Sequence, residues 1–114
     1  MAGNSAISCH IFHDYAYEIG TGNDFKVHSQ ADILKIEFNI SESGNFSANV
    51  KVKMEYDSPW REHPIVQMSP TFPILTTVTD PNYLYELDLR GISEIRIELA
   101  SLTGYITIRA RAVG

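Results

Sequence analysis

Alternation of apolar and polar residues over residues 34–56 is the feature that most constrains how this chain folds. The apolar positions are Leu34, Ile36, Phe38, Ile40, Phe46, Ala48, Val50, Val52, Met54 and Tyr56. A repeat of two turns one set of side chains toward a core and the other set toward water, as in a β-strand. The five residues 41–45, which include Gly44, interrupt the pattern. They predict a hairpin loop between two paired antiparallel strands.

The last third of the chain repeats this alternation three times. Apolar side chains recur at every second position within 83–89, 95–99 and 106–112, and Gly91 and Gly104 mark the interruptions. This arrangement predicts three further strands in a meander. Shorter strands are expected at 7–13, at 25–28 and within 65–68 and 74–78. In the first of these Cys9 alternates with Ile7 and Ile11, which predicts a buried thiol.

The fold class follows from these strands and from the lack of any helical repeat in the sequence. Seven or eight short strands with one apolar face each must bury those faces against one another. Two packed antiparallel sheets achieve this most economically, so we expect an all-β protein with an immunoglobulin-like or jelly-roll β-sandwich. The topology stays open, and the Cys…Trp…Cys arrangement of a true immunoglobulin domain is absent. A length of 114 residues predicts a single domain, 1–114.

Two stretches lie outside the clear strands. Residues 1–30 are a possible N-terminal arm, and residues 57–81 form a connection that holds all five prolines. Proline lacks a backbone donor, so this connection should be irregular or run along a sheet edge. Both stretches are candidate contact surfaces; alternatively, they cover sheet edges and prevent strand addition.

The charge balance and the cysteine count exclude several classes of protein. Nine basic residues against fourteen acidic ones give a net charge of −5, which argues against nucleic acid as a partner. No apolar run approaches the roughly 18 residues that cross a bilayer, so no membrane partner is expected. The first residues carry no secretory signal, and the single Cys9 excludes an internal disulfide. We therefore expect synthesis in a cytoplasm.

Residues able to carry out chemistry are scattered in this sequence. The four histidines include no tight ligand pair of the kind that nucleates a zinc site. Glu86 and Asp88 are two positions apart and share the outward face of one strand, as a pair of catalytic carboxylates could. Arginines interleave with the acids of this region, however, as expected for ordinary cross-strand ion pairs. Neither a nucleophile motif nor a phosphate-binding loop is present. The sequence predicts no enzyme, no cofactor and no metal.

Aromatic residues are the best candidates for partner contacts. Trp60 lies in a turn after the long strand that begins at residue 46. An exposed tryptophan there would suit a sugar ring or a protein partner, whereas a buried one would close one end of the sandwich. The candidate partner contacts are Trp60, Arg61, Phe72, Tyr15 and Tyr17.

Three segments together resemble small β-sandwich proteins of tailed bacteriophages. Residues 44–60 are similar to their Gly-x-Phe hairpin, long alternating strand and polar turn that ends in Trp60. Residues 85–97 resemble their tyrosine, aspartate, glycine and arginine pattern, and residues 101–110 resemble their final hairpin. The turn before Trp60 lacks the usual glycine. The stretch 64–73 and the first 30 residues lie outside the resemblance.

The resemblance implies a non-enzymatic virion protein. Such domains serve as head decoration proteins, head fibres and tail or baseplate accessories, and a capsid decoration protein is the leading expectation. The implied partners are the major capsid protein or other virion proteins, and the implied state is a homo-oligomer such as a trimer. The implied location is the virion. The alternative is a carbohydrate-binding β-sandwich that uses Trp60 and nearby tyrosines.

Overall fold

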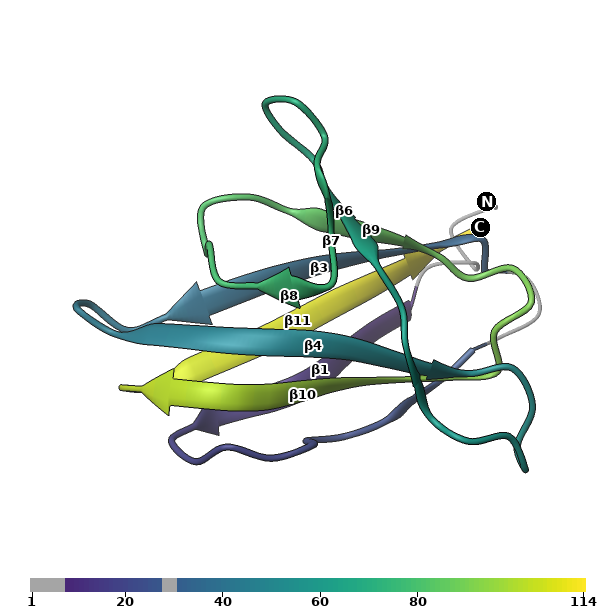
Figure 1. The fold of residues 1–114 in the computed structure, drawn as a ribbon, viewed down its shortest axis with the longest axis horizontal. Coiled ribbons are helices and arrows are strands. Elements are labelled where there is room, and N and C mark those ends of the chain that lie inside the picture. Colours follow the sequence, from purple (N-terminus) through teal and green to yellow (C-terminus); the bar gives the residue numbers. More distant parts are fainter. Residues whose placement is uncertain (1–7, 28–30) are drawn as a thin grey trace.

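The computed structural model describes residues 8–27 and 31–114, which form eleven strands and no helix. The strands pack as two antiparallel sheets (Figure 1). This confirms the predicted antiparallel β-sandwich. The strand count exceeds seven or eight because five short strands of two or three residues supplement the long ones. The strands are β1 (Ser8–Ala16), β2 (Phe25–Lys26), β3 (Ile33–Ile40), β4 (Asn45–Lys53), β5 (Arg61–Glu62), β6 (Ile65–Gln67), β7 (Ile74–Leu75), β8 (Thr77–Val78), β9 (Tyr85–Asp88), β10 (Glu94–Thr103) and β11 (Ile106–Val113).

The strand order mixes distant parts of the chain. The first sheet has the order β1-β11-β3-β9-β6-β7, and the second has the order β2-β10-β4-β5, with β8 also paired to β4. Every ladder is antiparallel. The apolar faces of both sheets point inward and form one core. The largest fully buried side chains are Tyr85, Phe12, Phe38, Leu34, Ile36, Ile65, Leu87, Leu89, Ile95, Ile97, Ile106 and Ile108.

The predicted hairpin over residues 34–56 is wrong. β3 pairs with β11 and β9, whereas β4 pairs with β10 in the opposite sheet. The two strands instead face each other across the core, where the rings of Phe38 and Phe46 stack with centroids 5.4 Å apart. Alternation shows which side of a strand is buried but does not identify the strand beside it. A turn that looks like a hairpin loop can therefore cross between sheets.

The predicted C-terminal meander is wrong for the same reason. β9 and β11 belong to the first sheet and β10 to the second, so the chain changes sheet twice in this region. β10 is the centre of the second sheet and pairs with β4 over nine positions. The connections from β9 to β10 and from β10 to β11 therefore each link one sheet to the other.

The N-terminal strand departs from strict alternation. Two register shifts, between Ile11 and His13 and between His13 and Ala16, place both Phe12 and His13 inside the sandwich. Cys9 is exposed, which corrects its predicted burial. A β-bulge adds a residue to one strand and changes which side chains point inward, and alternation alone cannot predict this.

Both stretches outside the clear strands, 1–30 and 57–81, contribute strands to the sheets. Residues 1–7 and 28–30 lie outside the described residues, but β1 is an edge of the first sheet and β2 an edge of the second. In the proline-rich stretch, β5 and β7 also lie at sheet edges, as proline content predicts. β6 is not at an edge, because it pairs with both β7 and β9.

Candidate interaction surfaces

The five predicted contact residues do not form one site. Tyr15 lies near the end of β1 and Tyr17 directly after it, whereas Trp60 and Arg61 lie where the chain enters β5. Phe72 belongs to the loop between β6 and β7, which projects from the top of the view in Figure 1. The structure therefore presents three separate regions.

Tyrosines gather where β1 ends beside the turn from β10 to β11. The rings of Tyr17 and Tyr105 meet edge to face, with centroids 6.0 Å apart. Tyr15, Tyr17, Ile19 and Tyr105 are 72%, 69%, 63% and 55% exposed, and we call these four residues the tyrosine edge. Tyr105 was not among the predicted contact residues, although its position directly after Gly104 in a turn is a signal of exposure. Exposed aromatic residues of this kind are common anchors of protein interfaces.

The backbone at Tyr15 is held in an unusual conformation. Its φ angle is +46°, a left-handed value that costs a bulky residue of order 1–3 kcal/mol. The second register shift of β1 contains this residue, and the backbone N–H of Tyr15 donates to Oγ1 of the buried Thr107 at 3.1 Å. The bulge and this hydrogen bond hold the strained residue in place while its ring stays in solvent.

Trp60 lies over the outer face of the second sheet. The Arg96 guanidinium lies over the indole ring, with Cζ 4.1 Å from the ring centroid, and Nζ of Lys53 lies 4.9 Å from it. Two hydrogen bonds of 3.0 and 2.9 Å join Arg96 to the carboxylate of Asp24, which raises the pKa of the guanidinium. The half-buried ring therefore neither closes an end of the sandwich nor offers an uncovered platform for a sugar.

Phe72 and Arg61 are both exposed, Phe72 in a loop and Arg61 in an edge strand. Phe72 is 56% exposed in a tight loop that the backbone hydrogen bond from Gln67 N–H to the Pro73 oxygen closes. Arg61 pairs with Val52 at the edge of the second sheet. Neither side chain contributes to a cluster with the tyrosine edge.

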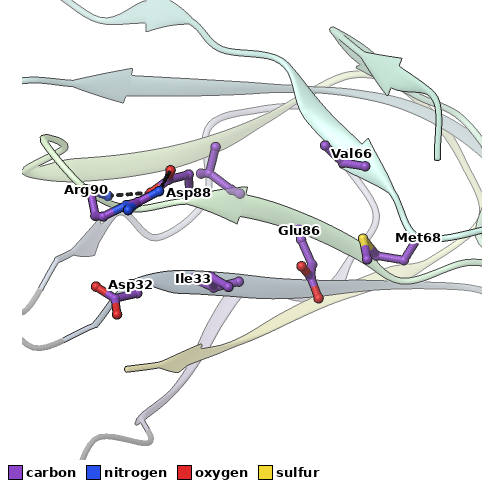
Figure 2. A pocket seen from close by; sticks show the side chains of 8 residues that line it. Asp32, Ile33, Val66, Met68, Glu86, Asp88 and Arg90 are labelled. Atoms are coloured by element: carbon purple, nitrogen blue, oxygen red, sulfur yellow. Dashed lines mark hydrogen bonds and ion pairs between the residues drawn. The ribbon is translucent and has the colours of Figure 1, made fainter.

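One hollow of about 460 Å³ lies on the outer face of the first sheet, beside β3, β9 and β6. Its apolar lining includes Ile33, Val66 and Met68. Figure 2 shows Arg90 and Asp88 joined at one end of this hollow, with Glu86 and Met68 toward the other end. The closest contact between Asp88 and Arg90 is 2.7 Å, and this pairing lowers the pKa of the exposed Asp88 carboxyl to about 2.

A second hollow of about 620 Å³ lies on the same outer face, over β1, β11 and β3. Its charged lining consists of Lys35, Glu37, Arg109 and Arg111. The remaining lining is Cys9, His10, Ile11, Leu84 and Ala110. Sequence reasoning placed the arginines outward but did not find either hollow, because the neighbours of β3 and β11 had not been identified.

Buried titratable groups have structural partners. Burial lowers the pKa of His13, whose Nε2 donates to the backbone oxygen of Ile97 at 2.7 Å. Burial also raises the pKa of Tyr85 to about 12, and its hydroxyl donates to the Asp80 oxygen at 2.6 Å. Among residues 8–27 and 31–114 no group of three His, Cys, Asp or Glu residues is placed to hold a metal ion. Within the same described residues no helix has the length and hydropathy needed to span a membrane.

Comparison with solved structures identifies two proteins with this fold. The SPBc2 prophage-derived protein YomS is 17% identical, with a TM-score of 0.85 over 95% of this chain and 93% of that protein. The PBSX exported protein XepA is 18% identical, with a TM-score of 0.85 over 95% of this chain but only 38% of that longer protein. At these identities the likeness shows a shared fold. No protein-family model matches this chain. No curated protein matches it either.

Proposed function

We propose that this protein is a non-enzymatic structural component of a bacteriophage particle, most specifically a decoration protein that binds the assembled capsid. The observation that carries the proposal is the fold shared over nearly the whole chain with YomS, which is described as prophage-derived. XepA, which contains the same fold as part of a longer chain, is described as a PBSX exported protein. A prophage-derived protein that shares this sandwich over nearly its whole length supports a phage role for this chain.

The tyrosine edge supplies a surface for attachment to the capsid. The tyrosine edge presents three tyrosines and an isoleucine, all more than half exposed, from the bulge of β1, the segment directly after β1 and the turn before β11. Tyrosine combines a large apolar area with a hydroxyl and loses little side-chain entropy on binding, so it suits a protein interface. We assign contact with the major capsid protein to this edge.

The arrangement at Trp60 favours this function over carbohydrate binding. Arg96 already lies over the indole ring and is itself held by Asp24, so a sugar would have to displace a paired guanidinium. A tail or baseplate position remains the other phage role compatible with a binding sandwich.

The experiment is a purification of the phage that encodes this sequence, followed by mass spectrometry of heads and tails separated from each other. We expect the protein in the head fraction at a fixed ratio to the major capsid protein. Purified protein should also bind preformed capsids lacking it. Its detection in tails alone would assign it to a tail accessory role, and its absence from purified particles would refute a virion function.

Variants connect this result to the tyrosine edge. Replacing Tyr17 and Tyr105 by serine should weaken capsid binding at least about tenfold, the effect of losing interface aromatic anchors. The matched control is Tyr56→Ser, since Tyr56 is 84% exposed but lies outside the edge. Equal binding by both variants would refute the assignment of this edge without affecting the virion result.

A further inference from the structure

The outer face of the first sheet carries a continuous row of side chains across five strands. Direct cross-strand pairing places Cys9 opposite Arg111, Arg111 opposite Lys35, Lys35 opposite Glu86, and Glu86 opposite Val66. Arg111 thus has a like charge on one side and a thiol on the other. Like charges placed directly opposite one another destabilise a sheet unless an anion compensates them. Glu86 compensates Lys35, to which it is ion-paired at 3.3 Å, but Arg111 lies one strand further away.

The two hollows on this face carry opposite charges. The hollow beside β9 is lined by the three carboxylates Asp32, Glu86 and Asp88 and by the one guanidinium of Arg90, a net charge of −2. The charged side chains of the hollow over β11 are three basic ones and one carboxylate, a net charge of +2: Lys35, Arg109, Arg111 and Glu37. The ion pair between Lys35 and Glu86 lies at the boundary, because each hollow is lined by one member of the pair.

This charge distribution is self-complementary under a two-fold rotation. Consider an axis between two facing copies that runs parallel to β3 and β9 above the Lys35–Glu86 pair. Rotation about it lays the basic hollow of each copy over the acidic hollow of the other and places Lys35 opposite Glu86 twice. Exposed apolar side chains accompany these charges on the same face, since Ile11, Ile33 and Leu84 are 40%, 38% and 50% exposed. Isologous interfaces are built in this way, from one surface patch that fits a copy of itself.

We propose that the outer face of the first sheet is the interface of a two-fold homodimer, with a second copy of this chain as its occupant. The proposal is independent of the proposed virion function, since it rests only on this face. The five strands β1, β11, β3, β9 and β6 contain 9, 8, 8, 4 and 3 residues. At about 3.3 Å per residue and about 4.8 Å between strands they give a flat area of about 500 Å² per copy. This is smaller than the roughly 800 Å² per partner of a standard interface, so we expect a weak dimer that is sensitive to salt.

Sedimentation equilibrium of the full chain tests the proposal through reciprocal charge reversal. Arg109→Glu with Arg111→Glu changes the basic hollow from +2 to −2, and Asp32→Lys with Glu86→Lys changes the acidic hollow from −2 to +2. Each double variant alone should dimerise at least about tenfold more weakly than the native chain, because like hollows then face each other. An equimolar mixture of the two should form a heterodimer, because opposite hollows face each other again.

A control variant and a folding check accompany these measurements. Lys26→Glu with Arg61→Glu reverses two exposed basic residues at edges of the other sheet and should leave dimerisation unchanged. Circular dichroism of each variant confirms that it is folded before sedimentation. A native chain that stays monomeric at about 1 mM and low salt would overturn the proposal. So would a trimer that the charge reversals leave intact, or a mixture that fails to associate.

Discussion

The imidazole of His13 in β1 donates a hydrogen bond of 2.7 Å to the backbone oxygen of Ile97 in β10, which joins the two sheets through the core. The N-terminal segment pairs with β10 at two points: Phe25 pairs with Ile95, and Gly20 pairs with Leu99. Ile97 lies between these two points. Between them the segment 21–24 leaves the edge of the sheet. The side chain of His13 thus supplies a donor where a neighbouring strand would otherwise supply a backbone N–H.

The stability of the fold should therefore depend on the protonation of His13. Burial lowers its pKa below the ordinary 6.5, so the unfolded chain binds this proton at a higher pH than the folded chain does. The contribution of His13 is complete above pH 6.5 and is lost as the pH falls from 6.5 toward the lowered pKa. Denaturant unfolding of the native chain and of His13→Gln between about pH 8 and about pH 5 measures this effect. The difference in unfolding free energy between the two proteins should shrink at low pH, and a constant difference would contradict the prediction.

Gly22 lies where the segment 21–24 packs closely against β1, and this close approach requires a glycine. Its φ angle is +66°, and an added Cβ would collide with the Phe12 backbone oxygen and lie 2.6 Å from the ring of His13. Gly91 provides a matched control, because its φ is +82° but no atom lies within 4 Å of an added Cβ. Gly91→Ala should cost only the left-handed strain of about 1–2 kcal/mol.

Gly22→Ala adds a collision with backbone to the same strain, so it should cost at least about 1 kcal/mol more than Gly91→Ala. Urea unfolding of both variants and the native chain gives the comparison. Equal losses would show that the segment 21–24 moves away from β1 without penalty.

Tyr85 at the start of β9 anchors the preceding loop. Its hydroxyl donates to the backbone oxygen of Asp80, five residues earlier, in an arrangement that resembles the tyrosine corner of other β-sandwiches. Tyr85→Phe should lower the free energy of unfolding by about 1–2 kcal/mol, because the Asp80 oxygen loses its donor. Tyr105→Phe, at an exposed ring, should change it by less than about 0.5 kcal/mol.

Spectrophotometric titration tests Tyr85 independently of mutation. Its pKa is raised to about 12, chiefly by burial and then by the negative charge of Asp80. Because the folded pKa lies above the ordinary 10.0, the contribution of this group to stability is complete below pH 10 and declines as the pH rises toward 12. In the folded protein one tyrosine should ionise last. Its disappearance from the titration in Tyr85→Phe would assign it, and its persistence would contradict the assignment.

The sequence was sufficient to predict which side of each long strand is buried but not which strand lies beside it. Phe38 and Phe46 were correctly placed inward, yet they stack across the core rather than side by side in one sheet. Alternation shows which face of a strand is buried. Two strands paired in one sheet and two strands that face each other across the core both bury one face, so the pattern is the same in either case. Deciding between them requires the total arrangement of eleven strands.

The candidate contact surfaces were predictable only in part, for the same physical reason. Tyr15 and Tyr17 are exposed as expected of contact residues, but their neighbour Tyr105 comes from the other end of the chain. Cys9 was predicted to be buried because its alternation with Ile7 and Ile11 conceals the bulges of β1. The charged residues of the two hollows lie in β3, β9 and β11 or close to the ends of β3 and β9. These charged side chains lie side by side because strand pairing in the first sheet brings residues that are distant in sequence into one row.

Trp60, the single tryptophan, reports on the outer face of the second sheet. Arg96→Ala removes the guanidinium 4.1 Å from its ring centroid and leaves Asp24 without this partner. We expect tryptophan fluorescence to shift to longer wavelength, quenching by iodide or acrylamide to increase, and stability to fall by about 1 kcal/mol through loss of the cation–π contact. Lys51→Ala is the control, since Lys51 lies on the same face but pairs with Glu98. Unchanged fluorescence in Arg96→Ala would mean that the guanidinium does not cover the indole in solution, and the sugar-binding alternative at Trp60 would then regain its platform.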